Sequence, residues 1–297
     1  MLFLICPSLF TQMMFRNRKC GRPMTRFRYL KFATVLIAVL LLAIISVIAV
    51  SIRRQTANAD ALWKIVHGRC VPDMKTKHNP APCVSVNLAQ GEAGGFAILK
   101  DAKGNTQYLV IPTAKITGIE SPAVLAPNAI NYFSEAWAVT DLVDQRQNHT
   151  LPRTDFAIAI NSVSGRSQNQ LHIHVDCIQP RAKSVLEQLG PEIGTTWQRL
   201  PVKLSGHEYR AIWLPGTQLG QRNPFRLLAS SLPDPRQEMG GHTLVLVGAE
   251  REGQAGFILL DGKAPALAVA LSPFVKLGFG SGEELEDHGC QLANGAS

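Results

Sequence analysis

The stretch "NSVSGRSQNQLHIHVDCI", residues 161–178, is the most informative part of the sequence about the fold, and its second half carries the signal. Apolar and polar residues alternate there, in the order Leu171, His172, Ile173, His174, Val175 and Asp176. A period of two places the polar side chains on one face of a β-strand and the apolar ones on the other. The run therefore predicts a strand that carries two histidines and an aspartate on one face.

The polar face of this strand has three interpretations. Alternating polar residues are typical of a face exposed to solvent. Two histidines one residue apart, with Asp176 as a third ligand, are also the residue types of a zinc site. A neutral imidazole can instead attack a phosphorus atom, while the glycine-containing loop "SVSGRSQNQ" donates hydrogen bonds to the phosphate oxygens. The histidines and the loop beside them favour a functional site over a solvated face.

The rest of the chain alternates short strands and helices. The patterns predict a hairpin of strands at 96–100 and 107–112, a helix at 131–147 and a buried strand in "DFAIAINS". Residues 70–83, with prolines at positions 72, 80 and 82, predict a loop. After residue 179 the elements follow a similar order, which predicts a degenerate repeat over residues 195–297. We expect an α+β fold with an antiparallel sheet.

The apolar run Phe32–Val50 contains no charged residue. At about 1.5 Å per residue it reaches roughly 28 Å, enough for the core of a bilayer. It is longer than the apolar region of a cleaved signal peptide, so we expect an uncleaved transmembrane anchor over residues 32–52. Basic residues gather before it, with only Arg53 and Arg54 close behind: Arg16, Arg18, Lys19, Arg22, Arg26, Arg28 and Lys31. The positive-inside rule leaves residues 1–31 in the cytoplasm and exports residues 53–297.

This basic cluster supplies much of the net charge of +8. It is a topology signal and a contact for anionic lipid headgroups. The sequence has neither basic residues interleaved with aromatic ones nor zinc-finger spacing, so we expect no nucleic-acid partner.

Four of the six cysteines fall in the exported part: Cys70, Cys83, Cys177 and Cys290. An even number in an oxidising compartment predicts two disulfides, and the sequence alone allows three pairings. Local closure favours Cys70 with Cys83, which leaves Cys177 with Cys290 and ties the C-terminus to the histidine strand. A zinc site is the alternative, although the spacing of Cys70 and Cys83 fits one poorly.

The residues around the two histidines resemble the signature of the histidine-triad superfamily, through Asn161, Gly165, Gln168, His172 and His174. The resemblance implies a histidine-triad-like antiparallel sheet and cleavage of a nucleotide at its α-phosphate without a metal or other cofactor. His174 takes the position of the nucleophile. His172 takes that of the first histidine, which orients the site or binds phosphate. Asp176 occupies the position of the third histidine of the signature. This departure weakens the assignment to the strict histidine triad but does not affect the assignment of His174 as the nucleophile.

The same resemblance implies substrate contacts. Asn161 matches a position near the ribose or phosphate, and Gln168 and Asn169 stand where donors of the family meet the α-phosphate. Lys115, in the loop before the long helix, is a candidate phosphate contact. Arg166 is another, with an exposed loop position as the alternative.

A closer similarity covers nearly all of the exported part. The chain resembles the bacterial CDP-diacylglycerol pyrophosphatase family, a membrane-anchored branch of the superfamily, in "LWKIVHGRCVP", "NPAPCVSV", "GFAILKD", "QYLVIPTAKITGIESP", "AINSVSGRSQNQLHIHVDCIQP", "GHEYRAI", "QRNPF" and "EELEDHGCQL". This implies hydrolysis of CDP-diacylglycerol to CMP and phosphatidate, in phospholipid metabolism. The enzyme would be anchored once in the bacterial inner membrane, with its catalytic domain in the periplasm. His207, in a matching segment, joins the candidate substrate contacts.

Two alternatives stay open at this point. One is a metal-dependent phosphoesterase that uses His172, His174 and Asp176. The other is a nucleotide- or lipid-binding module without turnover.

Overall fold

The computed structural model describes residues 33–46, 49, 59–275 and 277–294. Residues 33–46 are helical and exposed, and within the described ranges we find no helix with the length and hydropathy needed to cross a bilayer. The predicted anchor, residues 32–52, falls partly outside these ranges. The domain that begins after it is a separate unit and is described by itself.

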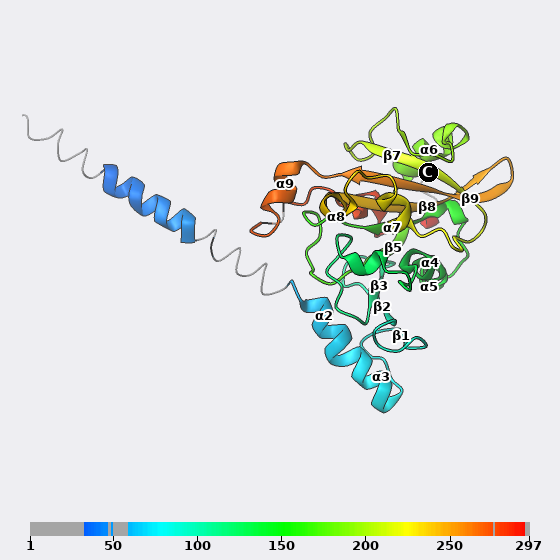
Figure 1. Ribbon diagram of the computed structural model, residues 1–297, viewed down its shortest axis with the longest axis horizontal. Helices are drawn as coiled ribbons and strands as arrows, with labels where there is room; N and C mark the ends of the chain where they lie inside the picture. Colours follow the sequence, from blue (N-terminus) through cyan, green and yellow to red (C-terminus); the bar gives the residue numbers. More distant parts are fainter. Residues whose placement is uncertain (1–32, 47–48, 50–58, 276, 295–297) are drawn as a thin grey trace, which may run out of the picture. The chain divides into compact units, whose positions relative to one another are not determined.

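One antiparallel sheet forms the centre of this domain (Figure 1). Its strands are β1 (Ser85–Asn87), β2 (Phe96–Lys100), β3 (Tyr108–Pro112), β4 (Phe156–Ile160), β5 (Ile173–Ile178), β6 (Gln198–Arg199), β7 (Tyr209–Pro215), β8 (His242–Arg251), β9 (Gln254–Lys263) and β10 (Glu286–Asp287). They are ordered β1-β2-β3-β5-β4-β8-β9-β7-β6, and β10 pairs with the end of β5. The predicted α+β class, the β2–β3 hairpin and the strand that carries His174 are confirmed.

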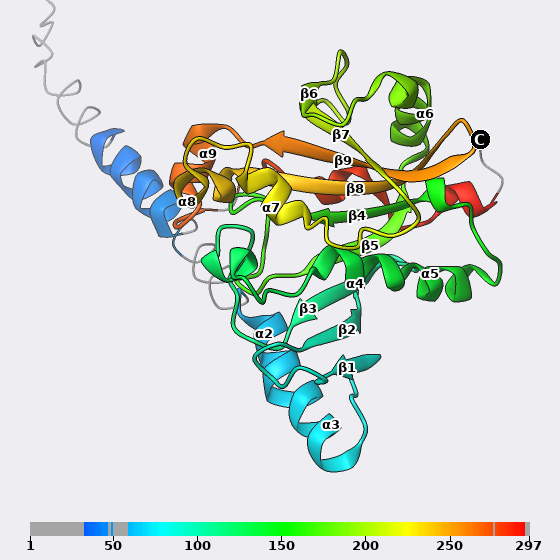
Figure 2. The same cartoon turned by 45° about the vertical axis from the view of Figure 1, so that its right-hand side comes forward.

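Helices cover both faces of the sheet. The α-helices are α2 (Ala61–Ile65), α3 (Val71–Lys77), α4 (Tyr132–Ala138), α5 (Thr140–Gln147), α6 (Pro180–Leu189), α7 (Pro224–Ala229), α8 (Pro235–Glu238) and α9 (Ala266–Leu271). A π-helix, η1 (Val66–Cys70), joins α2 to α3. The 3₁₀ turns are η2 (Pro122–Leu125), η3 (Arg153–Asp155), η4 (Gly190–Glu192), η5 (Met239–Gly241), η6 (Gly282–Leu285) and η7 (Gln291–Asn294). Figure 2 shows α4, α5 and α7 along one face, with α6 on the other side.

Three apolar clusters hold these layers together and leave a polar gap. The largest packs α4 and α7 on one face, where the rings of Phe133 and Phe225 lie 5.3 Å apart. On the other face, α6 packs on the half of the sheet that contains β7 to β9, and α2 with η1 packs on β1 to β3. β5 lies between these two clusters. His174 is paired with Leu109 of one cluster and Ala159 of the other, so the polar face of β5 fills the gap.

The two halves of the sheet share one order of strands. From the centre outward, β4-β5-β3-β2 in one half corresponds to β8-β9-β7-β6 in the other. The helices also correspond, because α4 and α5 connect β3 to β4 while α7 and α8 connect β7 to β8. β9, the counterpart of β5, has the sequence "QAGFILLDGK" and carries no histidine.

Two sequence predictions are wrong in detail. Residues 71–77 form α3 and not a loop. They continue the helical run of α2 and η1, and Pro72 follows directly after the π-turn, in which the N–H of Val71 bonds to the carbonyl of Val66, five residues back. The helix expected at 131–147 is divided into α4 and α5. Val139 lies between them and its N–H bonds to the carbonyl of Ala136, three residues back, which closes a tighter turn.

Candidate active site

Both histidines of the polar face are buried side by side. Their ring centroids lie 4.9 Å apart, and His172 and His174 are only 7% and 4% exposed. Asp176, next on the same face, is fully buried. Ala159 on the neighbouring strand leaves room for the imidazole of His174 because its side chain is a single methyl group. The interpretation of this face as solvated is therefore wrong.

His172 has one ring nitrogen fixed by the backbone. Its Nδ1 lies 2.7 Å from the carbonyl oxygen of Gln170, which can only accept, so Nδ1 carries the proton and Nε2 a lone pair. Gln170 is itself held by its amide, which donates to the carbonyls of Pro112 and Ala114. Burial, with a smaller effect of the Arg166 charge, lowers the pKa of His172. The ring is thus neutral at pH 7, and no described residue hydrogen-bonds its Nε2.

His174 has the opposite tautomer. The side-chain amide of Gln107 donates to its Nδ1 over 3.1 Å, which places the proton on Nε2. The Glu283 carboxylate lies 3.6 Å from Nε2 and stabilises a proton there. Asn161 Nδ2, which can only donate, lies 3.5 Å from Nε2 and donates to the Glu283 carboxylate over 3.3 Å, so the shorter contact with Gln107 decides the tautomer. Burial lowers the pKa of His174 to about 3, so this ring is a neutral hydrogen-bond donor.

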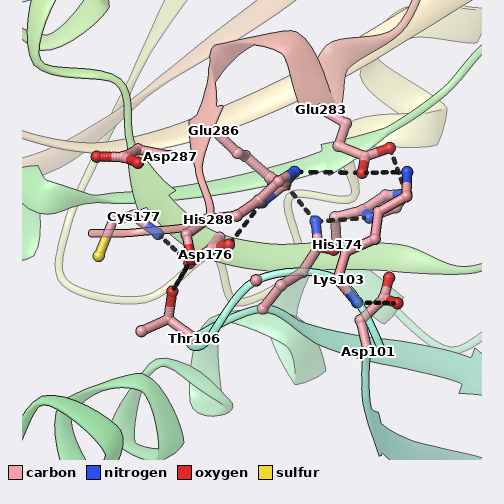
Figure 3. A network of polar contacts seen from close by, with 12 residues as sticks. Asp101, Lys103, Thr106, His174, Asp176, Cys177, Glu283, Glu286, Asp287 and His288 are labelled. Atoms are coloured by element: carbon pink, nitrogen blue, oxygen red, sulfur yellow. Dashed lines mark hydrogen bonds and ion pairs between the residues drawn. The ribbon is translucent and has the colours of Figure 1, made fainter. Parts of the chain in front are cut away.

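The C-terminal segment completes the site with a charged network (Figure 3). His288 Nδ1 donates to Asp176 over 2.8 Å, and its Nε2 lies 3.4 Å from Glu283. The hydrogen bonds to Asp176 and Glu283 raise the pKa of His288 to about 9, so it is an imidazolium at neutral pH. Burial acts to raise the pKa of Glu283, but the His288 hydrogen bond and nearby positive charges outweigh it and the net pKa is lowered. Thr106 donates to the other oxygen of Asp176.

A third carboxyl group, that of Glu286, is linked to His174 through the side chain of Gln107. Burial raises its pKa well above the usual range, and repulsion from Asp176 and Glu283 acts in the same direction. Gln107 donates to Glu286 over 3.1 Å as well as to His174. The amide of Gln107 thus links the buried Glu286 carboxyl group to Nδ1 of His174.

Two disulfides confirm the predicted pairing, Cys70 with Cys83 and Cys177 with Cys290. The second bond joins β5 to the C-terminal segment, and β10 pairs with the same end of β5. Together they hold Glu283 and His288 against the histidine face.

The loop between β4 and β5 is pressed against the C-terminal segment. Asn161 accepts hydrogen bonds from the Ser281 hydroxyl and from the backbone N–H of Glu283, both at 3.2 Å. A Cβ atom at Gly165 would lie 2.7 Å from the carbonyl oxygen of Gly280, so only glycine fits there. Asn161 therefore positions Glu283 beside His174.

The other predicted contacts lie in different local environments. Gln168 accepts from the backbone N–H of Leu62, and the N–H of Asn169 donates to Ala59, so both fasten the loop to the start of the domain. Lys115 pairs with Asp60.

Arg166 is buried and not in an exposed loop position. It forms a two-pronged ion pair with Glu120, at 2.5 and 2.7 Å. His207 pairs with Glu284. Within the part of the chain that the structure describes, no hydrogen bond or ion pair joins Lys115 or His207 to His172 or His174.

A cluster suited to a metal ion is not found. Within the ranges that the structure describes, no three or more His, Cys, Asp or Glu side chains are arranged as ligands. Asp176, the third ligand of the predicted alternative, is instead engaged by His288 and Thr106.

Six polar residues of this site were not predicted from the sequence: Thr106, Gln107, Gln170, Glu283, Glu286 and His288. For Gln170 a signal existed, because the polar face of period two continues back to it. Glu283 and His288 lie in "EELEDHGCQL", beside the cysteine predicted to reach β5. The predicted disulfide was thus the signal that could have brought them to the site.

Stability should depend on pH through His288. Its pKa is about 6.5 in an unfolded chain and about 9 in the fold, so between these values the folded state binds more protons. The stabilisation is complete below pH 6.5, and the free energy of unfolding should fall as pH rises from 6.5 to 9. Urea denaturation at stepped pH measures this. In the His288→Gln variant the free energy of unfolding should change little between these pH values. An unchanged slope in that variant would show that other groups cause the pH dependence.

Comparison with known proteins identifies the family. A sequence model described as CDP-diacylglycerol pyrophosphatase matches residues 57–294. A curated relative from Yersinia pestis, named CDP-diacylglycerol pyrophosphatase, is 37% identical over 265 residues, which cover 89% of this chain and 96% of the relative. On both counts the chain belongs to the CDP-diacylglycerol pyrophosphatase family.

Proposed function

We propose that this protein hydrolyses the diphosphate bond of CDP-diacylglycerol to CMP and phosphatidate through a histidine nucleophile. The family supports the reaction, and one observation carries the mechanism. Two neutral imidazoles lie side by side in opposite tautomers. His172 has a free lone pair on Nε2, and His174 has an N–H at Nε2 that can donate a hydrogen bond. A nucleophile and a donor are what displacement at a phosphorus atom requires.

The tautomers favour His172 as the nucleophile, although the signature assigned that role to His174. The hydrogen bond from Nδ1 of His172 to Gln170 leaves Nε2 as the lone pair. In His174, Nδ1 already accepts from Gln107 and Nε2 carries a proton that faces Glu283. His174 is accordingly the donor to a phosphate oxygen or to the leaving group.

The reaction then has two steps. Nε2 of His172 forms a bond to the α-phosphorus of the CMP group, and the bond from that phosphorus to the bridging oxygen breaks, so phosphatidate leaves with the electron pair. Water next attacks the same phosphorus, the phosphorus–nitrogen bond breaks, and CMP leaves while His172 regains its lone pair. The proton of the attacking water is released to solvent, because the lowered pKa of Glu283 makes its carboxylate a poor proton acceptor.

CMP release from CDP-diacylglycerol tests the function and separates it from a metal-dependent route. Purified enzyme in detergent should release CMP at the same rate with and without EDTA, because the proposed steps use imidazoles alone. A rate that falls with the chelator and returns with a divalent ion would instead favour the metal-dependent alternative. No CMP release under either condition would favour a binding module.

The same proposal includes a membrane anchor. The apolar run, the basic cluster before it and the two disulfides after it support residues 32–52 as a single span of the inner membrane. The N-terminus then lies in the cytoplasm and the catalytic domain in the periplasm. We further propose that residues 195–297 are a degenerate repeat, supported by the shared strand order, and that its strand β9 has lost the pair of histidines that its counterpart β5 and the residue before it carry.

A further inference from the structure

An apolar surface faces solvent on the segment that joins β9 to the site. We name it the α9 surface and define it by the exposed side chains Leu267, Leu271, Phe274, Leu277 and Phe279. Leu267 and Phe274 are 70% and 68% exposed, values unusual for side chains of this size in a folded domain. Figures 1 and 2 both show α9 at one end of the sheet, beside α8.

The helix α9 exposes large apolar side chains and buries small ones, the reverse of a helix that packs only on its own domain. Within α9 the buried residue is Ala268, and Ser272, the C-cap four positions further on, is buried as well, so the buried side chains are small. Leu267, Leu271 and Phe274 follow the spacing of one helical face, and this is the face left outside. An amphipathic helix normally buries its large apolar residues, so the outer face of α9 is fitted to a partner.

Composition indicates what that partner is. Between Ala264 and Phe279 the only charged residue is Lys276, and Lys263 directly precedes the segment. Lys263 pairs with Glu238, but the segment from Ala264 to Phe279 itself contains no acidic residue. An apolar segment with a single lysine and no acidic residue is complementary to a bilayer with anionic headgroups.

The α9 surface is continuous with the candidate active site. The hydroxyls of Ser162 and Ser164 donate to the carbonyl of Phe279, at 2.9 and 2.8 Å. Two residues further along the chain, the Ser281 hydroxyl donates to Asn161. The last residue of the α9 surface is thus fastened to the loop that positions the catalytic groups.

We propose that the α9 surface docks on an anionic phospholipid bilayer, so that a diphosphate at the membrane surface reaches the histidines while its acyl chains remain in the lipid. This inference rests on the proposed function for its substrate. The surface is separate from the predicted anchor, which holds the protein on the membrane but does not itself orient the site.

Activity on two substrates tests the inference with the full chain in anionic phosphatidylglycerol-containing vesicles. We expect the double variant Leu267→Glu, Phe274→Glu to lose about tenfold or more in CMP release from long-chain CDP-diacylglycerol in the same vesicles, because two apolar contacts with lipid are lost. Its rate on a short-chain, water-soluble CDP-diacylglycerol should stay near that of the wild type. Val202→Glu, at another exposed apolar position, is the matched control and should keep both rates.

Equal effects on both substrates would not support docking, and a second measurement then decides. Phe274→Trp in vesicles of brominated lipid should show more quenching than the wild type, in which the four native tryptophans give the background. No added quenching overturns the proposal, as does an unchanged long-chain rate in the double variant. A dimer that the double variant dissociates, without added quenching in Phe274→Trp, would assign the α9 surface to a second copy of the chain.

Failure of the proposed function has a different signature. Wild type that releases CMP from neither substrate would contradict the reaction. The quenching of Phe274→Trp would still report whether the α9 surface enters the lipid.

Discussion

Replacing His172 by Ala is expected to lower kcat for CMP release by about 10⁴-fold or more, the scale of losses seen when a covalent nucleophile is removed. The variant keeps the fold because the strand pairing of β5 does not depend on this side chain. The rate is measured with purified enzyme in detergent, at a saturating concentration of CDP-diacylglycerol. His172→Asn, which cannot attack phosphorus, should lose as much.

His174→Ala is the matched comparison, on the same face two residues away. Loss of a hydrogen-bond donor in the transition state costs about 10²- to 10³-fold, so this variant should retain measurable turnover. A wild-type rate in His172→Ala, together with complete inactivity of His174→Ala, would restore the assignment that the signature alone predicts.

Removing the Cys177–Cys290 disulfide should have the largest effect on stability. Its cysteines are 113 positions apart in sequence, and closing a loop of that length stabilises the fold by about 4 to 5 kcal/mol in the chain-entropy model. The double variant Cys177→Ala, Cys290→Ala should therefore unfold at a much lower urea concentration. It should also lose activity below its unfolding transition, because Glu283 and His288 are no longer held against β5.

The Cys70–Cys83 bond provides the control. Its cysteines are only 13 positions apart, which predicts about 3 kcal/mol, and it fastens η1 and α3 away from the histidines. The Cys70→Ala, Cys83→Ala variant should lose stability but keep kcat while folded. If both double variants lost kcat equally, the second disulfide would have no special role in the site.

Much of the first half of the fold could be predicted from local patterns. The period of two in β5 and the hairpin of β2 and β3 are encoded within a few residues each, so the sequence predicts them directly. The prolines between residues 70 and 83 misled the prediction there. Pro72 lies within a continuous helical run, directly after the π-turn η1, and only the two later prolines lie in the loop.

The chemical differences between the two histidines could not be predicted in the same way. They depend on the hydrogen bond that Gln107 donates to His174 and on the Glu283 carboxylate beside its Nε2, and these two residues lie 67 and more than 100 positions from His174 in sequence. An acid-rich run such as "EELEDHG" is usually a solvated surface, and nothing local shows that one of its carboxyl groups is neutral and another paired. The signature assigns the nucleophile by its position in the sequence, whereas the tautomers assign it by which ring nitrogen has a free lone pair.

Trapping the covalent intermediate tests the central claim most directly. Enzyme mixed with CDP-diacylglycerol, quenched in alkali within the first turnover and digested, is analysed by mass spectrometry for a peptide that carries CMP. We expect a CMP group on Nε2 of His172 in the wild type and no CMP-bearing peptide in the His172→Ala variant. A CMP group on His174, or turnover without any nucleotide bound to the protein, would contradict it.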